Sequence, residues 1–323
     1  MMINGGRFAF YDLAPGEESF RDAVLNGLGR VRKAIPCKFF YDARGSALFE
    51  EICRLPEYYP TRIEVAILDE NSSDIAAHMG PHCRVIEFGS GASQKVRILL
   101  QALERPAAYV PVDISREHLR DAAISLAEDF PSVPVIAVCA DYTRPFPLPS
   151  LSGAGGKRVG FFPGSTIGNF EPDAAVAFLA NYAHILGPGG EMLIGVDLKK
   201  ETDILEAAYN DRAGVTAAFN LNLLERVNRE LDGNLDIDRF EHLAFYNSAE
   251  GRVEIYICSL ADQTARIAGK RFRFAKNELI HTEYSYKYSV DEFRALAARA
   301  GFRPVDTWTD AAELFSVHYF RLR

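Results

Sequence analysis

The 323-residue sequence lacks the features that mark several classes of protein. No apolar stretch approaches the roughly 20 residues that a helix needs to cross a bilayer. The segment Met1–Arg7 lacks the basic and then apolar pattern of a signal peptide. Lys and Arg number 36 against 44 Asp and Glu, which leaves no basic excess for binding nucleic-acid phosphates. We therefore expect a cytoplasmic protein, a monomer, that binds neither nucleic acid nor membrane.

Cysteine and histidine are also sparse, and neither shows the spacing of a metal site. The five cysteines include no Cys-x-x-Cys pair, which predicts free thiols in a reducing compartment. Among the seven histidines, His78 and His82 have helical spacing, but a Gly-Pro pair between them interrupts any helix. We predict no metal site. The sequence also contains neither a Gly-x-Ser-x-Gly elbow nor a P-loop.

The middle third alternates short β-branched runs with amphipathic helical patterns, which predicts βαβ units around a parallel sheet. The predicted strands are 83–88, 108–113, 133–140, 158–162 and 192–197. One predicted helix runs from about Pro172 to Leu186 and ends at a glycine-rich turn, and Ser115 is placed to cap another. We predict an α/β fold, with a Rossmann-like domain over residues 63–197.

The flanks of this region follow other patterns. Residues 1–62 are rich in aromatic side chains, without strand–helix alternation. Helical patterns follow residue 197, and β-type alternation covers residues 252–260, 265–274 and 281–288. A capping box at Ser289–Glu292 begins a last helix, which Gly301 ends. We predict that residues 1–62 and 198–323 form a second, α+β domain that binds the substrate.

Acidic residues stand at three of the predicted strand ends, namely Glu87, Asp113 and Asp141. In an open parallel sheet, ligands bind beyond the carboxyl ends of the strands. A carboxylate at Asp113 is placed to accept both hydroxyls of a ribose. Asp141 and the aromatic Tyr142 are placed to meet an adenine amino group and ring. The pattern predicts a cofactor of the nucleoside type.

The turn Glu87–Gly91, with sequence Glu-Phe-Gly-Ser-Gly, helps to separate two such cofactors. Gly89 and Gly91 allow the backbone to approach a ligand closely. A dinucleotide site needs a third glycine and places a pyrophosphate on the helix N-terminus, whereas Gln94 and Lys95 open the helix here. S-adenosylmethionine has no phosphate, so the turn favours this cofactor. A dehydrogenase, or a tight turn without a ligand, stays open at this point.

Four further motifs are more specific than the glycine turn. They are Phe-Tyr-Asp-Ala-Arg-Gly-Ser at 40–46, Leu-Pro-Glu-Tyr-Tyr-Pro-Thr-Arg at 55–62, Gly-Ser-Thr-Ile-Gly-Asn at 164–169 and Gly-Val-Thr-Ala-Ala-Phe-Asn at 214–220. Together they resemble the histidine Nα-methyltransferases of ergothioneine biosynthesis. The resemblance extends from about Lys38 to the C-terminal strand.

The resemblance implies an activity and a set of site residues. That family methylates the α-amine of L-histidine three times with S-adenosylmethionine and gives the betaine hercynine. Its pattern implies that the cofactor is bound by Gly89, Lys95, Asp113, Asp141 and Tyr142. It implies that histidine is bound by Tyr58, Asn169, Tyr209, Glu283 and Ser285, with Tyr41 as the catalytic residue near the amine. The chain differs from examples of that pattern in having Asn210 and Ile255 where an aspartate and a methionine occur.

The chemistry of methyl transfer is compatible with these roles. The reaction needs a deprotonated amine held in line with the methyl group. Tyr41 is a poor base because an unperturbed phenol has a pKa of about 10, but it can position a water molecule. Glu283 and Ser285 stand two apart in a β-type run, so both face one side and can address the two nitrogens of an imidazole. Without the resemblance, the same spacing fits a strand that merely alternates its faces.

Two alternatives remain at this point. A methyltransferase of the same build that acts on another amine would differ only around Glu283 and Ser285. A protein of a different class, a non-catalytic binding protein, would keep the fold without the chemistry, and the intact Asp113 and Tyr41 disfavour it.

Overall fold

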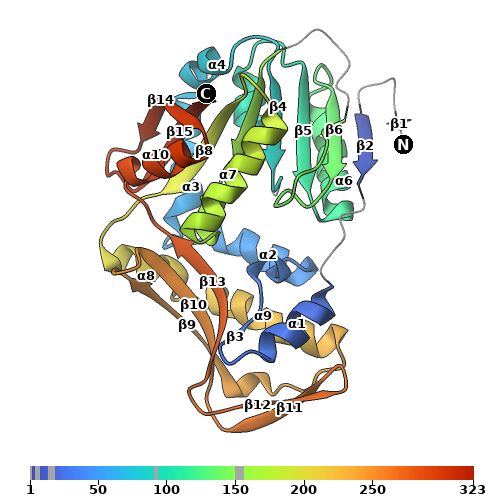
Figure 1. The fold of residues 1–323 in the computed structure, drawn as a ribbon, viewed down its shortest axis with the longest axis vertical. Helices are drawn as coiled ribbons and strands as arrows, with labels where there is room; N and C mark the ends of the chain where they lie inside the picture. Colours follow the sequence, from blue (N-terminus) through green and yellow to red (C-terminus); the bar gives the residue numbers. More distant parts are fainter. Residues whose placement is uncertain (1, 4–7, 14–18, 91–93, 150–155) are drawn as a thin grey trace. The chain divides into compact units, whose positions relative to one another are not determined.

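The computed structural model describes residues 2–3, 8–13, 19–90, 94–149 and 156–323 (Figure 1). The chain divides into two compact units, and each has a hydrophobic core cluster of its own. Unit 1 comprises Met1–Glu17, Pro60–Lys199 and Tyr288–Arg323. Unit 2 comprises Glu18–Tyr59 and Lys200–Lys287.

Unit 1 is built on a nine-stranded sheet in the order β1-β2-β6-β5-β4-β7-β8-β15-β14. Its strands are β1 (Met2–Ile3), β2 (Phe8–Asp12), β4 (Arg84–Phe88), β5 (Ala108–Asp113), β6 (Val135–Cys139), β7 (Arg158–Phe162), β8 (Glu191–Asp197), β14 (Phe302–Thr309) and β15 (Phe315–Leu322). Five neighbouring strands of this sheet are parallel to one another, namely β6, β5, β4, β7 and β8. Numbered among themselves by their order in the chain, they stand in the order 3-2-1-4-5 across the sheet, as in Rossmann folds. The predicted parallel α/β sheet is confirmed, with strand ends within two residues of those expected.

A helix connects β4 to β5, β5 to β6 and β7 to β8, because a parallel pair cannot be joined by a tight hairpin. The helices of unit 1 are α3 (Tyr59–Glu70), α4 (Ser72–Met79), α5 (Gln94–Ala102), α6 (Arg116–Asp129), α7 (Pro172–Leu186), α10 (Val290–Arg299) and the 3-10 helix η2 (Thr166–Asn169). Helix α7 crosses in front of the sheet in Figure 1 and has the predicted bounds. It begins with Pro172, whose fixed φ suits the first helical position, and ends at Gly187, where φ is +74°.

Unit 1 includes two segments that the predicted division placed in the second domain. Strand β2 pairs in parallel with β6 and extends one edge of the sheet. At the other edge, β15 pairs antiparallel with β8, and β14 pairs with β15. The predicted capping box of α10 is confirmed, since Ser289 and Glu292 each accept the other's backbone N–H. The predicted capping by Ser115 is wrong: its side chain makes no cap bond, and its N–H instead donates to Asp113 at 2.8 Å.

Unit 2 combines a four-stranded sheet, in the order β3-β13-β10-β9, with a separate β11-β12 hairpin. Its elements are α1 (Phe20–Leu28), β3 (Lys33–Ala34), η1 (Cys37–Phe40), α2 (Ala43–Ile52), α8 (Thr202–Tyr209), α9 (Val215–Glu230), η3 (Ile237–Arg239), β9 (Phe240–Asn247), β10 (Arg252–Ser259), β11 (Gln263–Ile267), β12 (Lys270–Phe274) and β13 (Leu279–Tyr286). The β-type run predicted over 265–274 is this hairpin. Its turn residues Ala268 and Gly269 both have positive φ, as in a type I′ hairpin turn.

The five cysteines are free, and Cys83, Cys139 and Cys258 are buried. Within the described part of the chain, we find no helix with the length and apolar character needed to cross a membrane.

Candidate active site

The turn after β4 brings the backbone close to an aromatic ring. Gly89 has a φ of +72°, in the left-handed region that favours glycine. Its N–H donates to the carbonyl of Val112 at 2.9 Å, and a Cβ at this position would lie 3.3 Å from the Tyr142 hydroxyl. The Ser90 hydroxyl is buried and finds no hydrogen-bond partner among the residues described. The predicted turn ends at Gly91, which lies outside the described residues.

The carboxyl group at the end of β4 belongs to the interior of unit 1. Glu87 is only 3% exposed, and the Tyr109 hydroxyl of β5 donates to it. Burial raises the pKa of Glu87 to about 7, although the hydrogen bond from Tyr109 and the charge of Lys95 act in the opposite direction. Glu87 is therefore poised to exchange a proton near neutral pH.

The other two acidic strand ends hold their own turns. Asp113, the last residue of β5, accepts the N–H of Ser115, and burial raises the pKa of its carboxyl group. Asp141 follows β6 and accepts the N–H of Thr143 at 3.0 Å. The ring of Tyr142 packs edge-on against Phe88, with centroids 6.1 Å apart. The structure thus places both carboxylates and the Tyr142 ring after adjacent parallel strands, at the sheet edge where ligands bind.

Lys95, at the start of α5, is held by a buried carboxylate that was not predicted from the sequence. Glu64 of α3 is 1% exposed and forms an ion pair with Lys95. The two oxygens of Glu64 also accept the N–H of Gly164, at 3.0 and 2.9 Å. Glu64 thereby fixes both Lys95 and the start of the loop that follows β7. A sequence signal for it exists, since it is the one charged residue in the apolar run 63–68.

The loop after β7 contains Asn169, a predicted substrate residue. Asn169 ends η2, which begins after Ser165, a residue with a φ of +54°. The Ser165 hydroxyl accepts the N–H of Asp197 at 2.9 Å, so β8 anchors this unusual backbone conformation. Strands β4 and β7 are neighbours where the strand order reverses, which is the usual ligand site of such sheets. Asn169 belongs to unit 1, whereas the other predicted substrate residues belong to unit 2.

Unit 2 contains an aromatic pocket. Most of the predicted substrate residues line it together with apolar side chains from α2, α8 and α9. The lining residues are Phe40, Tyr41, Phe49, Ile52, Tyr58, Ala208, Tyr209, Thr216, Phe219, Asn220, Ile255 and Glu283. The Tyr58 and Tyr209 rings meet edge to face, with centroids 6.4 Å apart. Burial raises the pKa of the Tyr58 phenol well above its usual value, so this hydroxyl stays neutral.

Tyr41 stands at the rim of this pocket and is 43% exposed. Its ring meets the edges of Phe49 and Phe219, with centroids 5.6 and 5.8 Å away. The next residue, Asp42, caps α2 by accepting the Gly45 N–H at 2.7 Å. Asp42 also accepts hydrogen bonds from two side chains of α9, and these contacts fix the backbone next to Tyr41.

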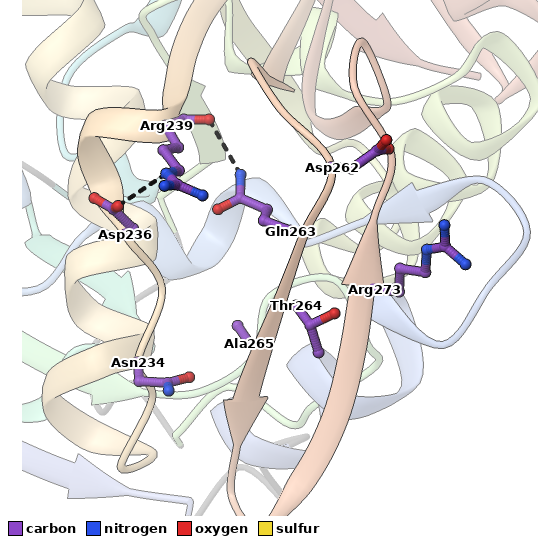
Figure 2. Close-up of a pocket in the computed structure, with 8 residues that line it drawn as sticks. All are labelled: Asn234, Asp236, Arg239, Asp262, Gln263, Thr264, Ala265 and Arg273. Carbon is purple, nitrogen blue, oxygen red and sulfur yellow. Dashed lines mark hydrogen bonds and ion pairs between the residues drawn. The ribbon is translucent and has the colours of Figure 1, made fainter.

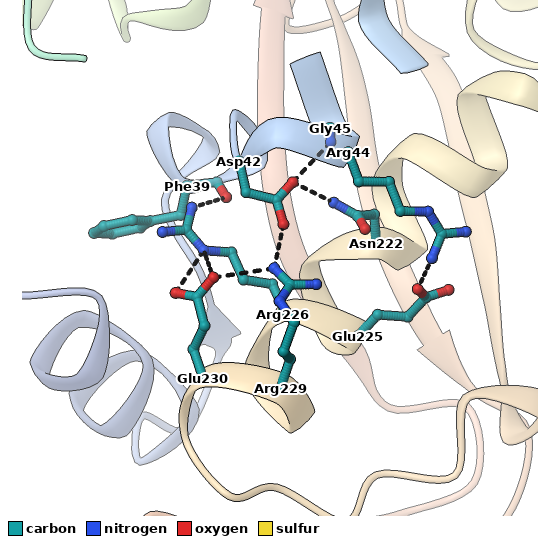
Figure 3. A network of polar contacts seen from close by, with 9 residues as sticks. All are labelled: Phe39, Asp42, Arg44, Gly45, Asn222, Glu225, Arg226, Arg229 and Glu230. Atoms are coloured by element: carbon teal, nitrogen blue, oxygen red, sulfur yellow. Dashed lines mark hydrogen bonds and ion pairs between the residues drawn. The ribbon is translucent and has the colours of Figure 1, made fainter. Parts of the chain in front are cut away.

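Figure 3 shows the polar network around Asp42. The Asn222 amide donates to one carboxylate oxygen at 2.9 Å, and Arg229 donates to the other. Partial burial alone would raise the pKa of Asp42, but these bonds and the Gly45 N–H hold it below its usual value. The carboxylate is therefore ionised throughout the neutral range and ties α2 to α9.

Glu283 lies on β13 directly opposite Ile255 of β10. Burial raises the pKa of Glu283 to about 7, and the positive charge of Lys287 acts against this rise. A register shift between Ile255 and Tyr256 marks a β-bulge in this pair of strands. The bulge brings the Thr282 hydroxyl onto the Ile255 carbonyl at 3.1 Å. A β-bulge changes the direction of the side chains around it, and this one lies next to Glu283, whose carboxyl group lines the pocket.

Ser285 is not among the residues that line the pocket. Its hydroxyl and that of Tyr209 lie 2.8 Å apart, and the buried Lys287 ammonium donates to both, at 2.8 and 2.9 Å. Lys287 was not predicted from the sequence, although it stands two residues beyond Ser285, with the same spacing that predicts Glu283 and Ser285 on one face.

Two other features lie apart from the predicted site residues. An open polar cavity of about 520 Å³ is lined by residues such as Asp236, Arg239 and Arg273 of unit 2 (Figure 2). In unit 1, ligand-type atoms of Asp74, His78 and Asp306 lie within 4.8 Å of one another. The prediction of no metal site considered histidine spacing alone, which cannot detect such a group. The two carboxylates already accept protein hydrogen bonds, from Trp308 and from the His78 ring.

The sequence is similar to known proteins over almost its whole length. The profile of the family described as "Histidine-specific methyltransferase, SAM-dependent" matches residues 20–322. Histidine N-alpha-methyltransferase of Mycolicibacterium smegmatis is 42% identical over 306 residues, covering 93% of this chain and 94% of the relative. The enzyme of the same name from Mycobacterium tuberculosis is 38% identical over 310 residues, covering 94% of both chains. Ergothioneine biosynthesis protein 1 of Neurospora crassa is 31% identical over 285 residues, covering 86% of this chain and 32% of the relative.

Proposed function

Because the chain belongs to the family of S-adenosylmethionine-dependent, histidine-specific methyltransferases, we propose that it methylates the α-amine of L-histidine. It transfers up to three methyl groups, and the final product is the betaine hercynine. The observation that carries this proposal is the aromatic pocket of unit 2, which places the Glu283 carboxyl group among Tyr41, Tyr58 and Tyr209.

The residues after the parallel strands of unit 1 fit S-adenosylmethionine. The positive φ of Gly89 provides close backbone approach, and the buried Ser90 hydroxyl has an unused hydrogen-bonding capacity among the described residues. Asp113 would hold the ribose hydroxyls, and Asp141 with Tyr142 would hold the adenine. Lys95, fixed by Glu64, is placed next to the Gly164 loop, where it would meet the carboxylate of the cofactor.

The bound cofactor supplies a methyl group on a positively charged sulfur, so the protein need not activate a leaving group. What remains for the chain is to hold the amine in its neutral form and in line, mainly an effect of proximity. Tyr41, at the rim of the pocket, positions the water that takes the amine proton. The faces of Tyr41 and Tyr58 suit the cationic nitrogen that forms as methyl groups accumulate.

Glu283 selects the substrate in this proposal by accepting an imidazole N–H. A pocket with a polar group committed to one ligand atom rejects side chains that leave this group unpaired. Ile255, directly opposite, supplies an apolar wall for the ring.

The test is to incubate the pure protein with S-adenosylmethionine and each amino acid in turn, and to follow product mass. Histidine should gain up to three methyl groups. If another amine gains methyl groups and histidine gains none, the proposed substrate is wrong.

We also propose that the protein acts as a monomer in the cytoplasm on this small molecule, without nucleic acid or membrane. The five free thiols support a reducing compartment. Sedimentation of the purified protein tests the oligomeric state, and fractionation of the source cells tests the compartment.

A further inference from the structure

A buried amide in the wall of the substrate pocket has no role in the proposed function. Asn220 of α9 lines the pocket and is 1% exposed. Its Oδ1 atom is buried and finds no hydrogen-bond partner among the residues that the structure describes. Nearly all buried polar groups in proteins are hydrogen-bonded, so an unpaired acceptor in a pocket wall points to a ligand that donates to it.

Two hydrogen bonds fix the orientation of this amide. The Nδ2 group of Asn220 donates to the Tyr256 carbonyl and to Nδ1 of His242, both at 2.9 Å. A carbonyl only accepts, so rotation of the amide by half a turn would set two oxygens against each other. The oxygen of Asn220, and not its NH2 group, is therefore the atom that remains for a ligand.

The ring of His242 is held in the matching form. Its Nε2 donates to the Tyr209 carbonyl at 2.9 Å, which leaves Nδ1 as an acceptor for the Asn220 amide. Burial lowers the pKa of His242, although the hydrogen bond to Tyr209 and the charge of Asp211 act in the opposite direction. A neutral His242 thus keeps the amide in place near neutral pH.

Asn220 and Glu283 approach the same part of the pocket from different elements. The Asn220 amide binds the carbonyl of Tyr256. The residue before it, Ile255, lies directly opposite Glu283 in the β10–β13 pair. In the proposed function the imidazole packs on Ile255. The ring then has two acceptors near it, a carboxylate from β13 and an amide oxygen from α9.

Resting on the proposed function, we infer that Asn220 is a specificity-determining residue, whose Oδ1 accepts one N–H of the imidazole while Glu283 binds the other ring nitrogen. Neutral imidazole has only one N–H and cannot serve two acceptors. The complex therefore takes up one proton from the solvent, and this proton lies between the second ring nitrogen and the Glu283 carboxylate. An indole, which has one N–H and no second nitrogen, leaves one of the two groups unpaired.

Other ionisable groups lie around Glu283 and the pocket. Besides His242, they are Cys37, Tyr41, Tyr58, Tyr209 and Lys287. Burial raises the pKa of Glu283 to about 7, and the charge of Lys287 acts against this rise. Burial also raises the pKa of Cys37 to about 12 and that of Tyr58 well above its usual value, so both stay neutral. All these groups are common to the wild-type protein and its Asn220 variants, so a difference between them reports Asn220.

Proton uptake, measured by calorimetry on the whole protein, tests the inference. The binding enthalpy of hercynine at about pH 8 is measured in phosphate and in Tris, whose ionisation enthalpies differ, and the two values give the number of protons taken up. Hercynine contains the imidazole, but its trimethylated nitrogen has no proton to exchange. With pKa values of about 7 for free Glu283 and about 6.5 for the free ring, the wild-type protein should take up about 0.9 proton.

Asn220→Leu removes the acceptor and fills its place. The ring should then bind in its neutral form with its N–H on Glu283, and proton uptake should fall to about zero. From about pH 7.5 to 8.5, the dissociation constant of hercynine should rise about sevenfold for the wild-type protein and change less than about twofold for the variant.

Asn228→Leu is a matched control on the same helix. Asn228 lies about two turns further along α9, where its amide binds the backbone of Leu235. It is not among the residues that line the pocket. This variant should take up as many protons as the wild-type protein. L-Histidine serves as a second ligand, because its amine contributes equally in every protein and cancels in their difference.

Each outcome decides the inference. Uptake near zero in the wild-type protein overturns it, as does undiminished uptake in Asn220→Leu or an equal loss in Asn228→Leu. A merely structural role of Asn220 would weaken binding without changing the number of protons. If melting shows that Asn220→Leu does not fold, the unbranched Asn220→Met replaces it. If the wild-type protein binds neither ligand, the proposed function itself fails, whereas binding without proton uptake overturns this inference alone.

Discussion

Replacing Glu283 by Gln tests the proposed substrate pocket most directly. The change keeps the size of the side chain and removes the charge that would accept an imidazole N–H. A hydrogen bond to a charged group contributes about 1.5–3 kcal/mol. The amide oxygen of the variant still accepts, but a neutral hydrogen bond contributes only about 0.5–1.5 kcal/mol. The difference of about 1–1.5 kcal/mol should raise the dissociation constant for histidine about 5- to 12-fold at about pH 8, where the wild-type carboxyl group is ionised.

The pH dependence follows from the pKa of Glu283, which burial raises to about 7. If histidine binds the ionised form, the wild-type affinity contains the fraction ionised, which falls from about 0.9 at pH 8 to about 0.1 at pH 6. The amide of the Glu283→Gln variant does not titrate. The advantage of the wild-type protein over the variant should thus shrink about tenfold between these two pH values.

Calorimetric titration with histidine measures both effects, and titration with S-adenosylhomocysteine measures the cofactor site separately. Glu241→Gln is a matched control, because Glu241 is an exposed glutamate on β9 of the same sheet. A loss of equal size for histidine and the cofactor product would refute the reasoning. A loss in affinity that does not change with pH would show that Glu283 is not the acceptor described here.

Three further predictions concern buried or capping carboxyl groups that hold the cofactor and substrate sites in place. Glu87 has a folded-state pKa of about 7, against 4.5 for the free group. Its contribution to stability is therefore full below pH 4.5 and is lost as the pH rises through 7. In urea titrations, Glu87→Gln should raise the free energy of unfolding by about 3 kcal/mol at about pH 8, with no gain at about pH 4. Glu64→Ala leaves Lys95 without its buried partner and should cost about 3–5 kcal/mol in the same assay, whereas the exposed Glu70→Ala on the same helix should cost less than about 0.5. Asp42→Ala removes a helix cap and should lower the free energy of unfolding by about 1–2 kcal/mol. Because the pKa of Asp42 is lowered in the folded protein, this cost should disappear as the pH falls below about 4, the pKa of the unfolded group. An equal cost at low pH would show that it does not come from the ionised carboxylate.

The parallel sheet could be predicted because its signal is local. Each strand buried on both faces is a continuous apolar run, and each helix between them shows its own periodicity, as 172–186 does. The pairing of β2 with β6 and of β15 with β8 could not be predicted. A run such as Phe8–Asp12 indicates a strand but not its partner, since partners are chosen by contacts far along the chain.

The predicted site residues came mostly from motifs, and the structure shows what motifs leave out. Asp42 and Glu64 act through backbone N–H groups and charged partners on other helices, and no spacing within one element encodes such contacts. Lys287 was within reach, because the alternation of β13, continued one residue past its end at Tyr286, puts positions 283, 285 and 287 on one face. The bulge near Thr282 was not, since its register depends on the partner strand β10.

In the proposed function, Glu283 sets the discrimination of the substrate pocket. Burial among aromatic rings raises the pKa of this carboxyl group to about 7, and its ionised form needs a hydrogen-bond donor. An imidazole supplies an N–H, whereas an aliphatic side chain supplies none and would leave the carboxylate unpaired. Because an unpaired buried polar group costs about 1–3 kcal/mol, an amino acid with an aliphatic side chain should bind about 5- to 150-fold more weakly than histidine.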